Sequence, residues 1–460
     1  QVAESITLLY PDDPSQDATL GYHWDKANSP EKAYDYYIKA GAAAARLYAN
    51  VEARAHYSAA LAIIDRQEPS LHNQRRMIDT LLIVIGLSIY TSSLPDLLTR
   101  LEQVESYARE LLTGDGVLHE DVLRDMRIQF WKGRCSLLLG AVVPAIQHCQ
   151  RACVLAKTHD AQEVYAAACL MIGQSKFTQG HMGACWPYLQ DALAWLEPRA
   201  PSPDWIRVVG FQGLSLLARG EVSAGREYID KLWGPAKTLN LLATVYTYAA
   251  VGALLLHDWV ALKEAAQQML VQAEQGKDRR LAANSLWLLA RAEGELGNLD
   301  AAARHSENAQ SFFTKKVNNI LQDWFSVADA ETIMQMGRPA RAIEIVEQAI
   351  ELARSMGSIF GQGLGHRTWA RALALLPEPN WPEIEAHLAQ SVGLFELGEA
   401  WLELAHTQVA IAELATQRGE VQSASRHFAM AIQRYESAQL VPALTEARSS
   451  LERLYAAKTG

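Results

Sequence analysis

The feature that most constrains the fold of this chain is a set of small residues that returns about every 40 residues. The phrase GNLDAAARHSENA (297–309) is restated as GRPARAIEIVEQA (337–349) and as GEVQSASRHFAMA (419–431). Each unit carries a register residue, usually small, with a second small position seven residues later and a third twelve residues earlier. The register residues are Ala145, Cys185, Gly225, Leu262, Ala302, Ala342, Ile384 and Ala424. The positions twelve residues earlier are Gly133, Gly173, Gly213, Ala250, Ala290, Ala330, Ala372 and Ala412.

These fixed positions indicate pairs of antiparallel helices, because two helices approach closely only where their side chains are short. Apolar residues lie between them at intervals of three and four, as in WLLARAEGELG (287–297), which is the period of an amphipathic helix. The first helix of each pair ends near a Gly, the residue that best tolerates a left-handed helix stop. No segment alternates like a strand. The sequence therefore predicts an all-α solenoid of helix hairpins with a period of about 40 residues.

This spacing resembles the tetratricopeptide repeat, a helix–turn–helix unit with small residues at its packing points. The intervals of twelve and seven match that family, whereas the usual unit has about 34 residues. The resemblance implies a protein-binding superhelix. Longer helices would widen it, so the curvature of the standard repeat does not carry over to this chain.

The repeat also suggests how the chain is divided. Residues 1–14 are interpreted as the tail of an upstream helical segment, because Val2, Ile6 and Leu9 suggest a helix already under way and no initiating Met is present. Residues 15–112 are expected to form irregular hairpins, with one long helix near 30–47 packing on two neighbours. Residues 113–460 are expected to form a regular superhelix continuous with them. The Pro-bearing stretches 197–205 and 376–383 leave the register intact and are predicted to be loops.

The most specific text is GYHWDKANSPEKAYDYYIKAGAAAARLYANVEARAHYSAALAII (21–64). It resembles the start of the superhelical sensor region in bacterial signal-transduction ATPases of the STAND type, which include relatives of the maltose-regulon activator and cyclase- or kinase-linked ATPases. The positions that fit that pattern include His23, Lys32, Tyr36, Gly41 and Glu52. The C-terminal repeats resemble the same family.

The resemblance implies a non-catalytic sensor that binds an inducer or a partner protein in its concave groove and restrains an ATPase. The partners would be a protein, peptide or small-molecule inducer, and upstream nucleotide-binding and effector domains of the parent chain. No GxxxxGK[ST] phosphate loop occurs in this sequence, so the ATPase itself would lie outside it. The alternative is a constitutive tetratricopeptide adaptor that binds a peptide or protein with no ATPase attached.

The composition limits the classes of partner and the cellular compartment that the sequence favours. A net charge of −10 without a basic run argues against nucleic acid or a membrane surface as partners. The five scattered cysteines favour a reducing compartment, for which the cytoplasm is the default. No HExxH, CxxC pair or GxSxG motif occurs, so we predict no catalytic residue, no metal site and no cofactor.

Groove candidates follow from the tetratricopeptide resemblance, in which the first helix of each hairpin lines the concave face. Counting from the small residue of each first helix selects Arg127, Phe130, Arg134, Arg207, Asn284, Trp287, Arg291, Trp324, Glu331, His366 and Trp369. Trp287, Trp324 and Trp369 would offer stacking surfaces to a ligand if they face the groove. A shift of one residue turns a side chain about 100° into the hairpin, so both the groove and the core remain open for them.

Overall fold

The computed structural model describes residues 1–10, 13–47, 49–89, 92–113, 117–312 and 321–459. Within these ranges the regular structure consists of α-helices and two short 3-10 helices, and no strand occurs. The contacts divide the chain into two compact units. Unit 1 contains Gln1–Ser136 and Gln147–Ala168, and unit 2 contains Leu137–Ile146 and Cys169–Gly460.

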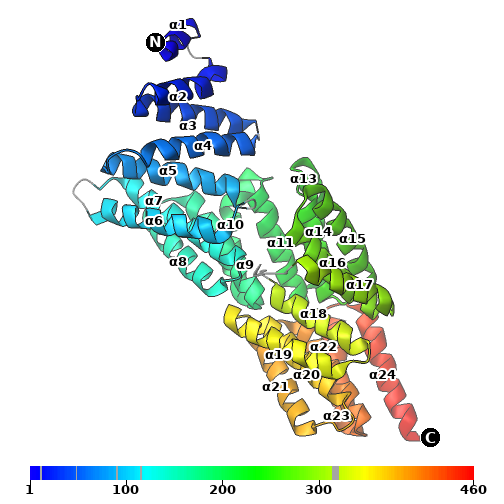
Figure 1. Cartoon of the computed structure of the whole chain (residues 1–460). Coiled ribbons are helices and arrows are strands. Elements are labelled where there is room, and N and C mark those ends of the chain that lie inside the picture. The colour runs from blue at the N-terminus through cyan, green and yellow to red at the C-terminus, as the bar shows by residue number, and fades with distance from the viewer. Residues whose placement is uncertain (11–12, 48, 90–91, 114–116, 313–320, 460) are drawn as a thin grey trace. The chain divides into compact units, whose positions relative to one another are not determined.

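Unit 1 is a series of antiparallel helices that follow one another along the chain (Figure 1). Its helices are α1 (Val2–Leu9), α2 (Asp17–Lys26), α3 (Pro30–Arg46), α4 (Asn50–Ile64), α5 (Leu71–Ser88), α6 (Leu94–Thr113), most of α7 (His119–Leu138) and of α8 (Val142–Thr158), and the start of α9 (Gln162–Gln179), with the 3-10 helix η1 (Pro14–Gln16). Helix α3 packs against both α2 and α4, as predicted. A Cβ atom at Gly41 would lie 2.9 Å from the ring of Tyr57, so glycine permits this close approach.

Unit 2 continues the same construction in helix pairs. Its remaining helices are α10 (Met182–Leu196), α11 (Pro203–Ala218), α12 (Val222–Asp230), α13 (Trp233–Thr238), α14 (Leu242–Leu255), α15 (Trp259–Gly276), α16 (Arg279–Glu295), α17 (Leu299–Phe312), α18 (Gln322–Gln335), α19 (Pro339–Met356), α20 (Ile359–Ala374), α21 (Trp381–Leu397), α22 (Trp401–Gln417), α23 (Val421–Ser437) and α24 (Val441–Thr459), with η2 (Glu197–Arg199). The second helix of one pair is broken into α12 and α13, and Pro235 in the first turn of α13 lacks the amide that a continuous helix would need.

The small residues are helix contacts, as predicted. Ala302, Ala342 and Ala424 are fully buried where the two helices of a hairpin cross. Several first helices end at glycines with positive φ, such as Gly337 (φ 74°) and Gly419 (φ 73°), and His257 (φ 53°) takes this place after α14. The stretch 376–380 is a loop as predicted, whereas 197–205 contains the 3-10 helix η2, a short loop at 200–202 and the first residues of α11. The fold is therefore an all-α solenoid of tetratricopeptide-like hairpins, and the repeat follows from close helix packing at fixed intervals.

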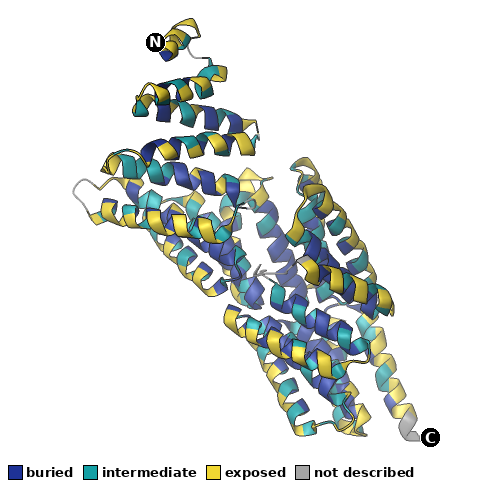
Figure 2. Cartoon of the chain, in the orientation of Figure 1, coloured by how far each residue is buried: buried dark blue, intermediate teal, exposed yellow. Residues whose placement is uncertain are grey.

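In unit 2 the first helices of successive hairpins form an inner wall. Helix α16 contacts α18, α18 contacts α20, and α20 contacts α22, while the second helices pack on the outside. Helix α11 also contacts α22, although several hairpins separate them along the chain. Buried residues concentrate on the faces between helices, and α24 is exposed along much of its length (Figure 2). The hairpins of unit 2 thus wind far enough for early and late helices to meet.

Candidate functional site

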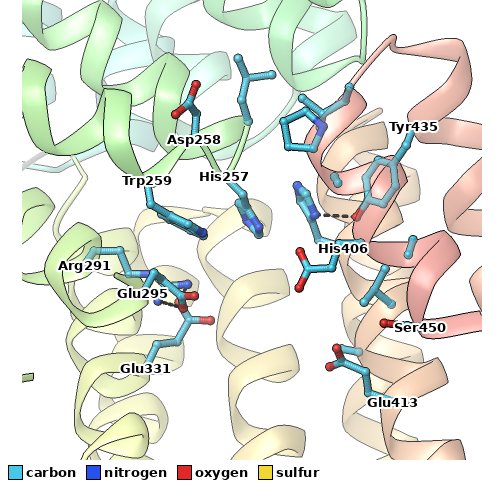
Figure 3. Close-up of a pocket in the computed structure, with 18 of the residues that line it drawn as sticks. His257, Asp258, Trp259, Arg291, Glu295, Glu331, His406, Glu413, Tyr435 and Ser450 are labelled. Atoms are coloured by element: carbon cyan, nitrogen blue, oxygen red, sulfur yellow. Dashed lines mark hydrogen bonds and ion pairs between the residues drawn. The ribbon is translucent and has the colours of Figure 1, made fainter. Parts of the chain in front are cut away.

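A cavity of about 560 Å³ opens on the inner wall of unit 2. Its polar walls come from α12, the start of α15, α16, α18, α20, α22, α23 and α24, and from the turn between α14 and α15 (Figure 3). The polar residues that line it are Arg226, His257, Asp258, Trp259, Arg291, Glu295, Glu331, Arg367, Arg371, His406, Glu413, Tyr435, Glu446 and Ser450. Volumes of about 300–1,000 Å³ are typical of small-ligand pockets.

One side of the cavity is an ion-pair network centred on Arg291. Its guanidinium lies 2.9 Å from Glu331 and also pairs with Glu295. It further stands 4.7 Å from the ring centroid of Trp259. Burial acts to raise the pKa of Glu331, but the neighbouring arginines hold that pKa below its ordinary value. Arg291 and Glu331 are therefore a charged pair fixed in place by their surroundings.

A second pair, Arg367 and Glu403, lies deeper. The guanidinium of Arg367 is 2.7 Å from the Glu403 carboxylate, and each side chain is about 5% exposed. Arg367 also donates to the Glu403 carbonyl oxygen and to the Thr407 hydroxyl, each at 3.3 Å. Burial raises the pKa of Glu403, and Arg367 partly opposes that shift. Such a pair holds its geometry because removing either partner leaves a buried charge uncompensated.

Two stacked histidines join distant hairpins beside this pair. The rings of His257 and His406 are parallel within 7°, with centroids 3.5 Å apart. Tyr435 and His406 share a hydrogen bond of 2.7 Å (Figure 3). Burial lowers the pKa of both histidines, to about 3 for His406, so both rings are neutral near pH 7. Neutral rings can stack closely without charge repulsion.

Aromatic side chains fill the interior next to the cavity. Trp324 stacks on Phe360 with centroids 4.2 Å apart, and Phe177 lies 6.1 Å from Trp324. Phe177 also packs against Phe211, and Phe360 packs against Phe395. These five residues form the aromatic plug, between helices that are distant in sequence.

Backbone contacts seal the same region. The amide of Met182 donates to the carbonyl oxygen of Gly398 at 2.9 Å. The Gln179 side chain donates to the carbonyl oxygen of Met356, 177 residues away in the chain. Only a space of about 30 Å³ remains between the plug and the charged layer formed by Arg291, Glu331 and Arg367. The cavity therefore ends at this layer and does not continue as an open channel.

Two of the predicted groove residues, Arg291 and Glu331, line the cavity. Both directly follow the small residue of their first helix, Ala290 and Ala330. The structure thus brings together residues at this one position of successive hairpins.

The side chains of the three candidate tryptophans pack in the core of the hairpins and do not line the cavity. Trp287 is 6% exposed and stacks on Phe325, with ring centroids 5.2 Å apart. Trp324 is 2% exposed and belongs to the aromatic plug. Trp369 is half-buried and stacks on His387 of its own hairpin. These positions are covered by aromatic side chains of the same or the next hairpin.

The other candidates lie apart from the cavity. His366 is buried, and its ring shares a nitrogen contact of 2.8 Å with His387. Arg207 pairs with Asp204 and donates to the Gln174 side chain, and Asn284 is half-buried. The remaining three belong to unit 1, where Arg127 is exposed and Phe130 and Arg134 are half-buried.

Sequence reasoning missed several cavity residues that the same counting could have found. Arg371 directly precedes the small residue Ala372. Extending the count to Ala412 selects His406, six residues before it, and Glu413, one residue after it. No repeat signal marks His257 or Tyr435, because they enter the cavity from a turn and from a second helix.

No group of three or more His, Cys, Asp or Glu residues within the described ranges is arranged to hold a metal ion. None of the helices in the described part of the chain is both long enough and apolar enough to cross a membrane.

Comparisons with known proteins yield only distant structural likenesses. No protein-family model and no curated protein sequence matches the chain. It is similar in structure to a Rap protein complexed with competence and sporulation factor, with 12% identity and a TM-score of 0.41, covering 92% of this chain and 99% of that one. Aspartyl phosphate phosphatase F from Bacillus subtilis gives 14% identity and a TM-score of 0.44, covering 78% and 93%. A STAND protein with a tetratricopeptide repeat sensor from Pyrococcus horikoshii gives 12% identity and a TM-score of 0.40, covering 96% of this chain and 74% of that one. At these TM-scores the likenesses assign no function.

Proposed function

We propose that this chain is a non-catalytic, ligand-sensing scaffold that regulates a bacterial signalling ATPase by binding an inducer in the cavity of unit 2. The observation that carries the proposal is the cavity itself, with a rigid floor of buried ion pairs and walls of polar side chains. The resemblance of residues 21–64 to the STAND sensor region supports the link to an ATPase.

The chemistry of the cavity favours binding over catalysis. A histidine whose pKa is about 3 is a weak base near pH 7, and the Nδ1 atom of His406 is already engaged by Tyr435. Both buried arginines are already paired with carboxylates, Arg291 with Glu295 and Arg367 with Glu403. These groups are suited to orienting a bound molecule.

The arrangement of the walls favours a regulatory role. Arg226 comes from α12, whereas Glu413 and Glu446 come from α22 and α24, so the walls belong to hairpins far apart in the chain. A ligand that touches both sides favours the conformation in which these hairpins are close. It can then shift a conformational equilibrium through its differential affinity for the two states.

A cavity-filling substitution tests the binding role. We expect a library of metabolites and peptides to contain a compound that raises the melting temperature of the parent chain but not of Ala443→Trp, which fills the cavity from α24. Ser449→Trp, on the same helix but exposed and outside the cavity lining, should still respond. A compound that stabilises all three proteins equally would argue against the cavity as the binding site.

The regulatory role has its own test in the parent reading frame. A GxxxxGK[ST] loop encoded upstream would support the sensor, and its purified ATPase should respond to the same compound. A parent protein without an ATPase would favour the constitutive adaptor instead.

A further inference from the structure

The closed inner end of the cavity limits the shape of its ligand. The layer of Arg291, Glu331 and Arg367 separates the cavity from the space of about 30 Å³ beneath it. Beyond that layer the aromatic plug fills the interior. A peptide running along the inner wall would have to displace both. A small molecule that enters from the open side needs to displace neither.

The floor of the cavity is balanced in charge. Three guanidinium groups face three carboxylates there, and they are Arg291, Arg367, Arg371, Glu295, Glu331 and Glu403. The most weakly held of them is Arg371, which lies 3.8 Å from Glu331 and whose side chain is 36% exposed. Because Glu331 already has Arg291 at 2.9 Å, Arg371 can turn toward a second anion.

Two acidic side chains line the cavity near Arg371, while Arg226 on α12 is a further basic residue of the walls. Glu413 on α22 and Glu446 on α24 line the cavity, are exposed to its solvent, and have no ion-pair partner within the described ranges. Although solvent reaches Glu413, desolvation by the enclosing walls raises its pKa; Arg371 lowers that pKa and Glu446 raises it further. A cation and a second anion therefore lie within electrostatic reach of one carboxyl.

We propose, building on the function proposed above, that the cavity binds a small zwitterion with an ammonium group beside a carboxylate, as in a free α-amino acid. The ammonium group lies between Glu413 and Glu446, which have no ion-pair partner among the described residues. The carboxylate pairs with Arg371, a geometry that guanidinium groups favour. The apolar lining residues Val409 and Pro442 leave room for an aliphatic side chain.

Isothermal titration calorimetry with the L-α-amino acids, one at a time, tests this assignment. We expect at least one to bind, and putrescine and succinate, each lacking one of the two charges, to bind at least about tenfold more weakly. Glu413→Gln and Arg371→Gln should each weaken binding about tenfold, since each removes one charge-assisted contact. Glu347→Gln, an exposed carboxylate on α19 outside the cavity, is the matched control and should bind as the parent does.

Three results would overturn the assignment: no amino acid binds at millimolar concentration, binding is unchanged in Glu413→Gln, or putrescine, succinate or glucose binds as tightly as any amino acid. If one of these other probes binds the parent chain and Ser449→Trp but not Ala443→Trp, the cavity is a ligand site of different chemistry. The proposed function then stands although the zwitterion does not.

Discussion

At the scale of single residues, the interior of unit 2 is unusual in the number of charged groups it buries. Arg291, Glu331, Arg367 and Glu403 are each 4–6% exposed. Nearly every such charge has an opposite partner, which is the condition for burying it. Two aspartates differ: Asp329 accepts hydrogen bonds from Ser306 and Gln310. Asp323 is fully buried, and neither of its carboxyl oxygens accepts a hydrogen bond of normal geometry from a described residue.

Asp323 should make stability depend on pH. Burial raises its pKa to about 7, although the Ser358 hydroxyl and the Trp324 amide act in the opposite direction. The unfolded chain loses this proton near pH 4 and the folded chain only near pH 7, so the free energy of unfolding falls as pH rises between these values. The free energy of unfolding of Asp323→Asn, taken relative to that of the parent, should therefore rise by about 2–4 kcal/mol between pH 4 and pH 8.

Urea unfolding of both proteins at pH 4 and pH 8 measures this gain. Asp230→Asn, at an exposed position at the end of α12, is the control and should show no such change. An Asp323→Asn variant whose difference from the parent is the same at both pH values would show that the carboxyl ionises normally.

Removing one partner of the Arg367–Glu403 pair should destabilise the fold much more than replacing both partners with apolar residues. Arg367→Met leaves Glu403 charged and buried, and should lower the free energy of unfolding by about 3–5 kcal/mol. The double variant Arg367→Met/Glu403→Met should recover most of this loss, because no unpaired charge remains. Arg354→Met, which breaks an exposed pair with Glu351, should cost less than about 1 kcal/mol. Denaturant unfolding of all four proteins checks the pattern, and equal losses in Arg367→Met and Arg354→Met would contradict it.

At the scale of elements, each hairpin depends on close contact between its two helices. The register residues sit at that contact, and in α17, α19 and α23 they are alanines with no exposed surface. Burial changes sharply within two residues of this contact, since Ala342 is buried and Glu344 is exposed. In these three hairpins the position holds only a short side chain, whereas α15 and α21 bury Leu262 and Ile384 there.

Enlarging a register residue should overpack the hairpin. Ala302→Leu and Ala342→Leu should each lower the free energy of unfolding by about 1–3 kcal/mol, because the extra atoms force the helices apart. Glu344→Ala removes only an exposed pair with Arg341 and should change stability little. Chemical denaturation of the three variants tests this, and unchanged midpoints for both leucine variants would place the contact elsewhere.

At the scale of the whole molecule, the property that shapes the candidate site is the closure of unit 2 on itself. Residues near Gly180, at the end of α9, meet the start of α20 and the end of α21. A Cβ atom at Gly180 would lie 2.5 Å from the Cβ atom of Phe360, and the backbone there has φ +95°. Glycine at this position lets the two parts of the wall touch.

Gly180→Val should open this contact. We expect faster hydrogen exchange in peptides covering 180–183 and 396–400, because the Met182 amide loses its bond to the Gly398 carbonyl oxygen. Gly419→Val is the matched control: it has a similar backbone conformation, φ +73°, but a Cβ atom there meets nothing within 4 Å. It should disturb only its own turn. Closure would not depend on Gly180 if both variants left exchange in these two peptides unchanged.

The sequence by itself determined the helix hairpins, their turns and their packing positions. The contact between the helices of a hairpin joins residues close in the chain, so small residues such as Ala330 and Ala342 record it directly. The tetratricopeptide resemblance, counted from these small residues, pointed to Arg291 and Glu331, because the position after each small residue recurs with the repeat.

Only the tertiary structure decided which side chains remain accessible on the inner wall. A small rotation between neighbouring hairpins accumulates along a solenoid, and no single repeat encodes its sum. In unit 2 the sum brings His257 against His406 and buries Trp324 behind Phe360. Closure of unit 2 therefore helps to bury a predicted groove residue, Trp324, and the cavity is lined by residues from distant hairpins.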